Sequence, residues 1–394
     1  MAITDKKKGV WGLDQTYNKI NQGSIWDYSG IFTFYGWGNN QYGQLGQNNT
    51  VKYSSPVQIP GTTWNASTIQ AYEHHVGVIK TDGTLWMWGY NDGAQLGQNN
   101  KTSYSSPVQV GGDTTWSKLT ESSTSWQSGA IKTDGTLWLW GGGASGELAQ
   151  NSRTRYSSPV QVPAGDTGVT WDMASQNEDS CLAIKTNGEL WAWGNNSSGL
   201  LGQNQAYAQL EKVSSPIQIP GTTWKRVAGS GYYQATAIKT DGTLWTWGAN
   251  DSPGYGQLGH NNNVAYSSPT QVPGTWDTGA DKFTAQRKLT AGIKTDGTLW
   301  IWGLNAQGQL GQNSVIHYSS PVQVPGTTWD KVGSAWYTTF AQKTDGTLWA
   351  WGENANGEYG LNNTTKYSSP IQIPGSWPSF ITAGEHNVFA TASV

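Results

Sequence analysis

The sequence contains very little cysteine and few charged side chains. Among 394 residues there is a single cysteine, Cys181, and the charged side chains are 23 Lys and Arg and 26 Asp and Glu. A single thiol excludes an internal disulfide framework and a cysteine-clustered zinc site. The formal net charge of -3 provides no basic field that would gather phosphates, so we expect no nucleic-acid partner.

Long hydrophobic runs are also missing. No window reaches the length of a membrane-spanning helix, so we expect no membrane insertion, and the lysines at positions 6–8 are followed by no apolar stretch of a secretory signal. The abundant residues are instead glycine, tryptophan and tyrosine, with 51, 24 and 18 copies. Disordered chains lack this much apolar surface. The sequence therefore predicts a folded protein that is stabilised by packing.

The dipeptide Trp-Gly occurs seven times at nearly regular spacing. Successive copies are 49 to 55 residues apart, and each unit also contains Ser-Ser-Pro followed by a further tryptophan. A period near 50 residues is typical of propellers and solenoids. The Trp-Gly tryptophans are Trp37, Trp88, Trp140, Trp193, Trp247, Trp302 and Trp351.

Each complete unit contains a predicted β-hairpin. In residues 79–89, Asp82-Gly83 lies between two β-prone runs, which favours a type I′ turn because both central positions need positive φ. On the second strand the two tryptophans face one way, and Leu85 and Met87 face the other. A sheet that is apolar on both faces packs between other sheets, as the blades of a propeller do.

The two ends of the chain carry complementary parts of one unit. The N-terminal copy has the strand of residues 34–38 but no hairpin strand before it, whereas the C-terminal copy stops after residues 383–390. We predict that residues 31–38 and 380–393 form one composite blade. This blade would close a ring and remove the exposed sheet edges that a solenoid leaves.

Three motifs recur in a fixed order along the chain. The units read Leu-Trp-x-Trp-Gly, then Gly-Gln-Leu-Gly, then Ser-Pro-Val-Gln. In these motifs residues 31–394 resemble the regulator of chromosome condensation repeat family. The resemblance implies an all-β, seven-bladed β-propeller with four antiparallel strands in each blade. It leaves function open, because the family includes exchange factors, chromatin binders, enzyme inhibitors and uncharacterised viral and bacterial modules.

Residues 1–30 lie outside the repeats and are interpreted as an attachment arm. Gly-Val-Trp followed by Leu, an acidic residue and Tyr resembles the leader of structural proteins of marine tailed bacteriophages. A segment this short cannot bury its apolar side chains against itself, so a partner chain or the propeller wall must cover them. The apolar residues of the arm are Trp11, Leu13, Tyr17, Ile20 and Trp26.

Most tryptophans belong to the repeat and are predicted to be core residues. Twenty of the 24 occupy framework positions, and only Trp11, Trp26, Trp126 and Trp336 do not. The six hairpin lysines, of which Lys80 is the first, each precede an Asp or Asn by two residues. We expect these lysines to form local pairs or a solvated rim, with an anion site at the ring as the alternative.

No combination of residues predicts catalysis, a cofactor site or a metal site. His74 and His75 follow Glu73, and we interpret both as structural histidines, with a metal ligand or general base as the alternative. No serine or cysteine nucleophile motif accompanies them. Cys181 begins an apolar strand and is interpreted as a small core residue.

The units differ most just before the first strand of each hairpin. Several of these differing positions hold tyrosine or tryptophan, and equivalent positions of a ring lie on one face. The aromatic side chains therefore predict a surface that binds a sugar or a protein. The alternative is that they form contacts specific to each blade junction. We expect the Gly-Gln-Leu-Gly loops on the opposite rim. The candidate face consists of Tyr72, Trp126, Tyr232, Tyr233, Trp336 and Tyr337.

These observations lead to an expected function. We expect a non-catalytic structural protein of a bacteriophage virion, bound to other virion proteins through its arm and used for adhesion to a host-surface glycan or protein from the tail. A capsid-surface or tail structural component is the close alternative. A soluble bacterial propeller that binds or inhibits another protein is the alternative from a different class.

Overall fold

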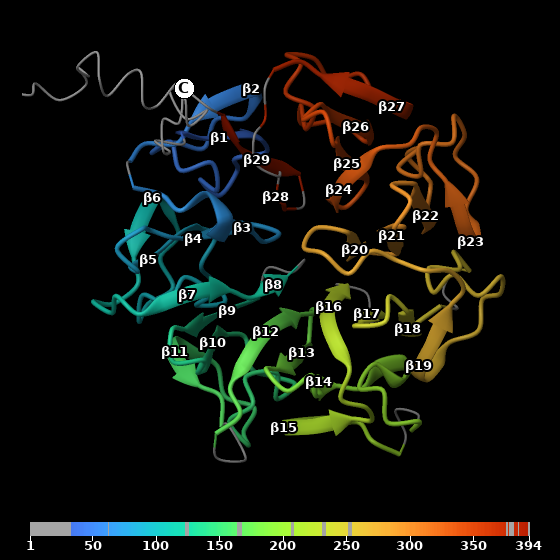
Figure 1. The fold of residues 1–394 in the computed structure, drawn as a ribbon. Helices are drawn as coiled ribbons and strands as arrows, with labels where there is room; N and C mark the ends of the chain where they lie inside the picture. Colours follow the sequence, from blue (N-terminus) through green and yellow to red (C-terminus); the bar gives the residue numbers. More distant parts are fainter. Residues whose placement is uncertain are drawn as a thin grey trace, which may run out of the picture.

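The structure, a computed structural model, describes residues 33–392 except 62, 123–125, 164–167, 206–208, 231–233, 251–253, 376, 378–381 and 385. In this part of the chain, seven β-sheets are arranged as blades around a central axis (Figure 1). The described residues contain no α-helix, only the 3₁₀ turns η1 (Ala66–Thr68) and η2 (Ser197–Gly199). None of their helical segments has the length and apolarity needed to span a bilayer.

Each blade has four antiparallel strands, numbered here from the blade that contains β1. The innermost strands of blades 1 to 7 are β28 (Thr382–Ala383), β3 (Gln70–Ala71), β7 (Trp116–Leu119), β12 (Trp171–Gln176), β16 (Trp224–Ser230), β20 (Phe283–Gln286) and β24 (Trp329–Ser334). The second strands are β29 (Asn387–Ala392), β4 (His75–Ile79), β9 (Gln127–Lys132), β13 (Ser180–Lys185), β17 (Gln234–Lys239), β21 (Leu289–Ile293) and β25 (Thr338–Lys343).

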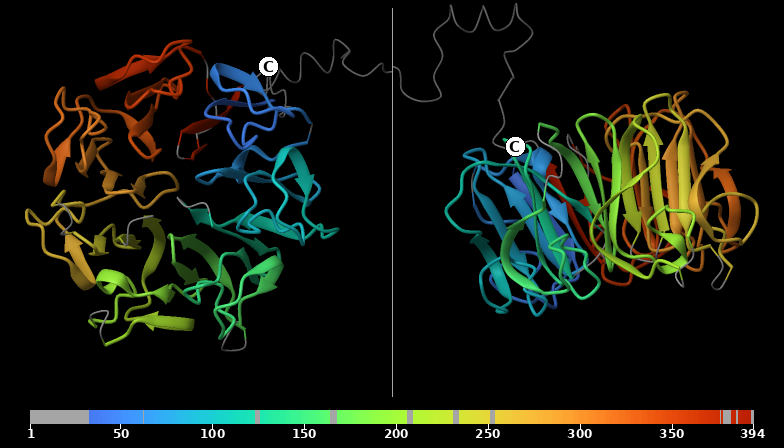
Figure 2. Two further views of the ribbon diagram at one scale, coloured as in Figure 1. Left: turned by 180° about the vertical axis from the view of Figure 1, so that it is seen from behind. Right: turned by 90° about the horizontal axis from the view of Figure 1, so that it is seen from below.

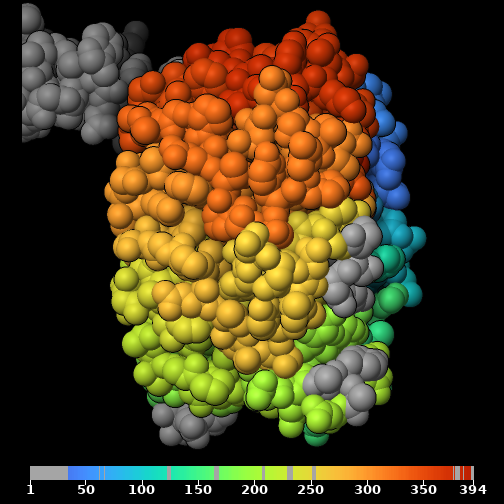
Figure 3. Space-filling view, turned by 90° about the vertical axis from the view of Figure 1, so that its right-hand side faces the viewer, coloured from blue at the N-terminus to red at the C-terminus, as the bar shows by residue number. Residues whose placement is uncertain are grey.

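The outer half of each blade is formed in the same way. The third strands are β1 (Thr33–Gly38), β5 (Leu85–Gly89), β10 (Leu137–Gly141), β14 (Leu190–Asn195), β18 (Leu244–Gly248), β22 (Leu299–Gly303) and β26 (Leu348–Gly352). The outermost strands are β2 (Tyr53–Gln58), β6 (Tyr104–Gln109), β11 (Tyr156–Gln161), β15 (Lys212–Ile219), β19 (Tyr266–Val272), β23 (Tyr318–Gln323) and β27 (Tyr367–Ile373). The right-hand view of Figure 2 shows the ring edge-on, and Figure 3 shows successive blades abutting along its outer wall.

One short strand links two blades. After β7, the chain of blade 3 continues into β8 (Glu121–Ser122), which pairs in parallel with β12 of blade 4. The sheet of blade 4 therefore has five strands.

The predicted composite blade is confirmed. β1 pairs with β29 in antiparallel register from Thr33 opposite Ala392 to Gly38 opposite Asn387, so the first and last described strands share one sheet. They lie side by side in Figure 1, blue beside red. The predicted all-β, seven-bladed propeller with four-stranded antiparallel blades is confirmed with it.

Tryptophan pairs form the core of every blade. Each Trp-Gly tryptophan is buried and packs against the tryptophan that stands at, or shortly before, the start of the inner strand of the same blade, with ring centroids 5.6 to 6.3 Å apart. Such pairs combine a large buried apolar area with favourable tilted or edge-to-face geometry. The prediction of core tryptophans is confirmed for these fourteen side chains.

The Trp-Gly tryptophans also link neighbouring blades. In each blade the indole Nε1 donates a hydrogen bond of 2.7 to 2.9 Å to a backbone carbonyl in the long loop of the preceding blade. Trp88 of blade 2 donates to Gln44 of blade 1, and Trp37 of blade 1 donates to Glu358 of blade 7. The second of these bonds closes the ring.

The long loops require glycine where they approach the next blade. Gly43 has φ +78°, and a Cβ at this position would lie 2.4 Å from Cα of Ser105 in blade 2. Only glycine combines this backbone conformation with this approach. The Gly-Gln-Leu-Gly and Ser-Ser-Pro motifs are therefore two sides of one contact between blades.

Removing residues 387–394 should destabilise the whole ring. The deletion removes β29 with its buried side chains Val388, Phe389 and Ala390 and exposes an edge of β1. Loss of buried aromatic and aliphatic side chains on this scale lowers the free energy of unfolding by about 5 kcal/mol or more. Denaturant unfolding followed by tryptophan fluorescence measures the effect.

A peptide supplied in trans provides the control for this deletion. A synthetic peptide of residues 386–394 should restore stability to the truncated chain, and the same peptide with Val388→Asp should not. An unchanged midpoint for the truncated chain would contradict the role of the composite blade.

Candidate binding face

Two sets of loops lie on one face of the ring. One set joins the first and second strands of each blade, and the other set, with the Gly-Gln-Leu-Gly motifs, joins the third and fourth. Backbone hydrogen bonds connect them, from Tyr90 N to the His74 carbonyl at 3.0 Å and from Gly142 N to the Trp126 carbonyl at 2.7 Å. The expectation of opposite rims was wrong, because antiparallel strands bring both connections to the same side. We call this side the loop face and the side of the Asp-Gly turns the turn face.

Four aromatic side chains from three blades form a continuous row on the loop face. Tyr42 of blade 1 lies 4.8 Å from His74 and 4.6 Å from Tyr90, both of blade 2, between ring centroids. Tyr90 lies 6.4 Å from Trp126, which leads into β9 of blade 3. We call Tyr42, His74, Tyr90 and Trp126 the aromatic row.

The aromatic row is accessible to a partner. Trp126 is 41% exposed, whereas the fourteen paired framework tryptophans are buried, and Tyr42, His74 and Tyr90 are partly exposed. The Tyr90 hydroxyl donates to Asp92 at 3.1 Å, which fixes the orientation of the ring. The row therefore presents pre-oriented aromatic edges to solvent.

Trp336 and Tyr337 lie in a second cluster on the same face. The guanidinium carbon of Arg287 in blade 6 lies 4.1 Å from the ring centroid of Trp336 and 4.2 Å from that of Tyr337. His386 of blade 1 lies 5.9 Å from Trp336. These contacts join blade 7 to blades 6 and 1. Both aromatic side chains are also partly exposed, so the cluster reaches the surface.

Tyr72 was wrongly predicted to lie on the exposed face. Its side chain is fully buried, stacks on His75 with ring centroids 4.3 Å apart, and donates from its hydroxyl to the Thr120 carbonyl at 3.3 Å. The residue packs inward because it precedes the tight connection to β4 and fills the junction of blades 2 and 3. Here the alternative of a junction contact is correct.

The remaining predicted site residues lie outside the described residues. These are Tyr232, Tyr233 and the arm residues Trp11, Leu13, Tyr17, Ile20 and Trp26. Sequence reasoning missed Tyr42 and Tyr90 because they belong to the long repetitive loops. A signal for Tyr42 exists, since the residue before the motif glycine is a small or polar side chain in most units but tyrosine at positions 42 and 255.

The histidines show no catalytic arrangement. Burial lowers the pKa of His75 well below its ordinary value, and its Nε2 lies 2.7 Å from the Ser128 hydroxyl in the junction of blades 2 and 3. Within the described ranges, no group of three or more His, Cys, Asp and Glu side chains is placed to hold a metal ion. Cys181 is buried, as expected for a core residue.

The turn face carries a ring of lysines held between tryptophans. Each hairpin lysine places its ammonium 3.8 to 4.5 Å from the ring centroid of the first hairpin tryptophan and 4.6 to 5.4 Å from that of the tryptophan at, or shortly before, the start of the inner strand. The first hairpin tryptophans are half-buried rather than core. Cation–π contacts therefore explain both residue types. The lysines are Lys80, Lys132, Lys185, Lys239, Lys294 and Lys343.

In the described part of the chain, none of these six lysines forms an ion pair with the Asp or Asn two residues on, although Lys185 makes a local pair with Glu189 at 4.0 Å and Lys132 pairs with Asp113 at 2.6 Å. Asp82 instead accepts hydrogen bonds from the backbone N and hydroxyl of Thr84, at 3.0 and 2.7 Å, and the Thr84 hydroxyl accepts one from Trp86 Nε1 at 2.9 Å. The aspartate is a turn acceptor, as is typical of this residue type. This relay holds the half-buried tryptophan against the lysine.

Two buried glutamates interrupt the row of glutamines in the long loops. At the motif position of Gln44, blade 3 has Glu147 and blade 7 has Glu358. Burial raises the pKa of Glu147 to about 7. Burial alone would also raise the pKa of Glu358, but hydrogen bonds from His386 and Asn356 hold it below its ordinary value.

A family profile and curated proteins match this chain. The profile of the regulator of chromosome condensation (RCC1) repeat matches residues 33–72, 82–123, 187–236, 241–284, 296–341 and 345–390. The chain is 27% identical over 311 residues to the human E3 ubiquitin-protein ligase HERC2, covering 77% of this chain and 6% of HERC2. It is 24% identical over 297 residues to the ultraviolet-B receptor UVR8 of Arabidopsis thaliana, covering 73% of this chain and 64% of UVR8. The chain thus spans less than two thirds of either relative.

Solved structures show the same fold at low identity. Prp20p from Saccharomyces cerevisiae superposes with a TM-score of 0.77 at 16% identity and 92% coverage of both chains. Human WBSCR16 gives a TM-score of 0.77 at 17% identity, and the match covers 92% of this chain and 99% of WBSCR16. These likenesses concern the fold alone.

Replacing Glu147 with glutamine should stabilise the protein at alkaline pH. Because the folded pKa of Glu147, about 7, exceeds the ordinary value of 4.5, its contribution is most favourable at low pH and is lost as pH rises from 4.5 to 7, by about 3 kcal/mol. Glutamine fits this position in other blades, where Gln44 accepts from Tyr42 N. Glu147→Gln should therefore match the parent near pH 4.5 and exceed its free energy of unfolding at pH 8.

Glu358→Gln is the matched control, because its carboxylate is stabilised in the fold. Its pH dependence has the opposite sign to that of Glu147. Because the pKa of Glu358 is lowered in the fold, the carboxylate contributes to the free energy of unfolding at pH values above the ordinary pKa of glutamate, and the contribution is lost as pH falls. Glu358→Gln should lower the unfolding free energy at pH 8. Parallel pH profiles for parent and Glu147→Gln would contradict the assignment.

Proposed function

This chain belongs to the regulator of chromosome condensation (RCC1) repeat family, and on that basis we propose that it is a non-catalytic binding propeller whose loop face holds a partner protein. The observation that carries the proposal is the aromatic row, with its exposed Trp126. Tyrosine and tryptophan are the side chains that most often anchor protein interfaces, because they bury a large area at low entropic cost.

The geometry of the row favours a protein over a sugar. Sugar rings stack on flat, exposed aromatic faces, but neighbouring rings here are inclined by 46° to 87°. Inclined rings form a corrugated surface into which side chains of a protein can insert. A glycan partner remains the alternative that the experiment below distinguishes.

Protein binding among relatives supports the same conclusion. Prp20p has been characterised for binding to Gsp1p and histones, and the yeast RCC1 protein has been crystallised with Kap60. Those partners belong to those proteins. What we carry over to this chain is the use of an RCC1 propeller as a protein-binding surface.

We further propose that the propeller is displayed on a bacteriophage particle. The leader resemblance of residues 1–30 is the basis, and the fold adds a geometric argument. β1 runs from Thr33 at the turn face to Gly38 at the loop face, so the segment before Thr33 joins the propeller on the side away from the aromatic row. Attachment through the arm would leave the loop face directed outward, as adhesion from a tail requires.

Trp126→Ala should weaken binding without weakening the fold. Loss of an anchoring aromatic residue costs about 2 kcal/mol or more, roughly thirtyfold in affinity, whereas a surface substitution changes stability by about 0.5 kcal/mol or less. Fluorescently labelled protein is titrated onto host cells, and the same samples are melted. Tyr367→Ala, an equally exposed aromatic residue at 40% on the outermost strand of blade 7, is the matched control.

Treatment of the cells identifies the partner class. Binding that is lost after mild protease treatment supports a protein partner, and binding that is lost only after periodate oxidation indicates a glycan. Equal adsorption of the Trp126→Ala and parent proteins would remove the aromatic row from the proposal.

Deletion of residues 1–25 should abolish incorporation into particles and leave a folded propeller. The described blades make all their paired strands from residue 33 onward, so melting should be unchanged. Immunoblotting of purified particles measures incorporation. Normal incorporation of the shortened chain would refute the arm as the attachment element, and absence of the full-length chain from particles would favour the soluble binding propeller.

A further inference from the structure

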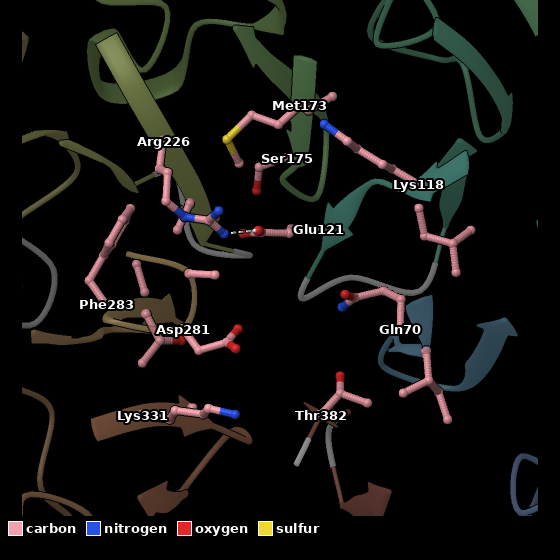
Figure 4. A pocket seen from close by; sticks show the side chains of 18 of the residues that line it. Gln70, Lys118, Glu121, Met173, Ser175, Arg226, Asp281, Phe283, Lys331 and Thr382 are labelled. Carbon is pink, nitrogen blue, oxygen red and sulfur yellow. Dashed lines mark hydrogen bonds and ion pairs between the residues drawn. The ribbon is translucent and has the colours of Figure 1, made fainter. Parts of the chain in front are cut away.

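A cavity of about 670 Å³ lies at the axis of the ring, between the inner strands. Polar side chains converge on it from six blades, as Figure 4 shows. This volume is within the range of small-molecule sites. We call the converging side chains the polar collar, which consists of Gln70, Glu121, Arg226, Asp281, Lys331 and Thr382.

The charges of the polar collar alternate in sign. Along the chain Glu121, Arg226, Asp281 and Lys331 give negative, positive, negative and positive groups, and Gln70 and Thr382 complete the collar with neutral ones. Arg226 Nη2 donates to Glu121 Oε1 at 2.7 Å, which spans from blade 5 to blade 3. A ligand that carries only negative charge would be attracted by Arg226 and Lys331 but repelled by the carboxylates of Glu121 and Asp281. A ligand that carries only positive charge would be attracted by the two carboxylates but repelled by Arg226 and Lys331.

Both acidic groups are presented by irregular segments of the inner strands. Glu121 lies in β8, where the chain of blade 3 leaves its own sheet and pairs with β12. Asp281 precedes β20, has φ +59° and accepts a backbone hydrogen bond from Val332 of blade 7 at 2.8 Å. The regular repeat would place neither carboxylate here, so the collar is a departure from the seven-fold pattern.

Two charged groups of the collar lack a direct partner. Among the described residues, neither the Asp281 carboxylate nor the Lys331 ammonium makes a side-chain hydrogen bond or an ion pair. Burial raises the pKa of Asp281, although Arg226, Lys331 and Lys282 act in the opposite direction. A ligand that supplied an ammonium to Asp281 and a carboxylate to Lys331 would satisfy both groups.

We propose that the axial cavity binds a small zwitterion of the α-amino-acid class. The ammonium of the ligand lies against Asp281, its carboxylate lies against Lys331 and the free side of Arg226, and its side chain extends toward Gln70 and Thr382. The cavity is larger than one amino acid, so it leaves room for a large side chain and for bridging water. This site is distinct from the loop face and does not depend on the proposed adhesion.

Calorimetric titration of the full-length protein with each of the twenty α-amino acids tests the site. At least one amino acid should bind, and its N-acetyl and carboxamide forms, each of which lacks one charge, should bind at least about tenfold more weakly, as expected for loss of one partner of a buried charged contact. No heat with any amino acid, or equal affinity for the singly charged forms, would overturn the proposal.

Variants assign the binding to the collar. Asp281→Asn and Lys331→Gln should each reduce affinity by at least about tenfold. Lys118→Gln removes a cavity-lining ammonium that is already paired with Asp172 at 2.6 Å, so this variant should retain the affinity. Melting curves identify any variant that fails to fold, and unchanged affinity in the folded Asp281→Asn or Lys331→Gln protein would overturn the assignment.

Discussion

The hydrogen bond from each Trp-Gly indole to the preceding blade is the interaction on which the rest of the structure depends. A blade buries one tryptophan pair within its own sheet, but the indole N–H needs an acceptor once it is removed from water. The acceptor is a backbone carbonyl of the neighbouring blade, so no blade supplies the hydrogen-bond acceptor for its own Trp-Gly indole. This requirement repeats around the circle, and the bond from Trp37 to Glu358 completes it.

This dependence separates the positions that repeat from unit to unit from the positions that differ between units of the same chain. Framework positions repeat because each must satisfy the same contact between blades, whereas the connections on the loop face and the inner strands at the axis carry no such requirement. Departures from the repeat therefore concentrate in these segments. Tyr42, Trp126, Glu121 and Asp281 are departures that reach the surface or the axial cavity, whereas Tyr72 fills a blade junction.

The fold could be predicted from the sequence almost completely, and the site only in part. The seven-fold period and the complementary chain ends determine the ring, because periodicity reports the contacts that every blade must make. Exposure of a single side chain depends on the path of one connection, which explains why Trp126 reaches solvent while Tyr72 is buried. The lysine contacts of the turn face were misjudged because Lys and Asp are close in sequence, but the strand directs lysine onto two indoles.

The polar collar was not identified from the sequence for a related reason. Its members are far apart along the chain, and each follows a framework tryptophan at a position that resembles an ordinary polar strand residue. Only closure of the ring brings them to one axis. A signal exists in retrospect, since a basic residue stands two positions after the framework tryptophan in three of the seven units, as Lys118, Arg226 and Lys331.

The composite blade determines how the ring carries mechanical load. β1 is held on both sides, by six residue pairs with β29 and by further pairs with β2. A pull on the chain at Thr33 acts along the strand axis, so it loads these hydrogen bonds in shear and all at once. A force applied across the strands would instead break the hydrogen bonds one at a time. The seam of the ring is thus oriented so that tension applied at its N-terminal end meets its strongest resistance.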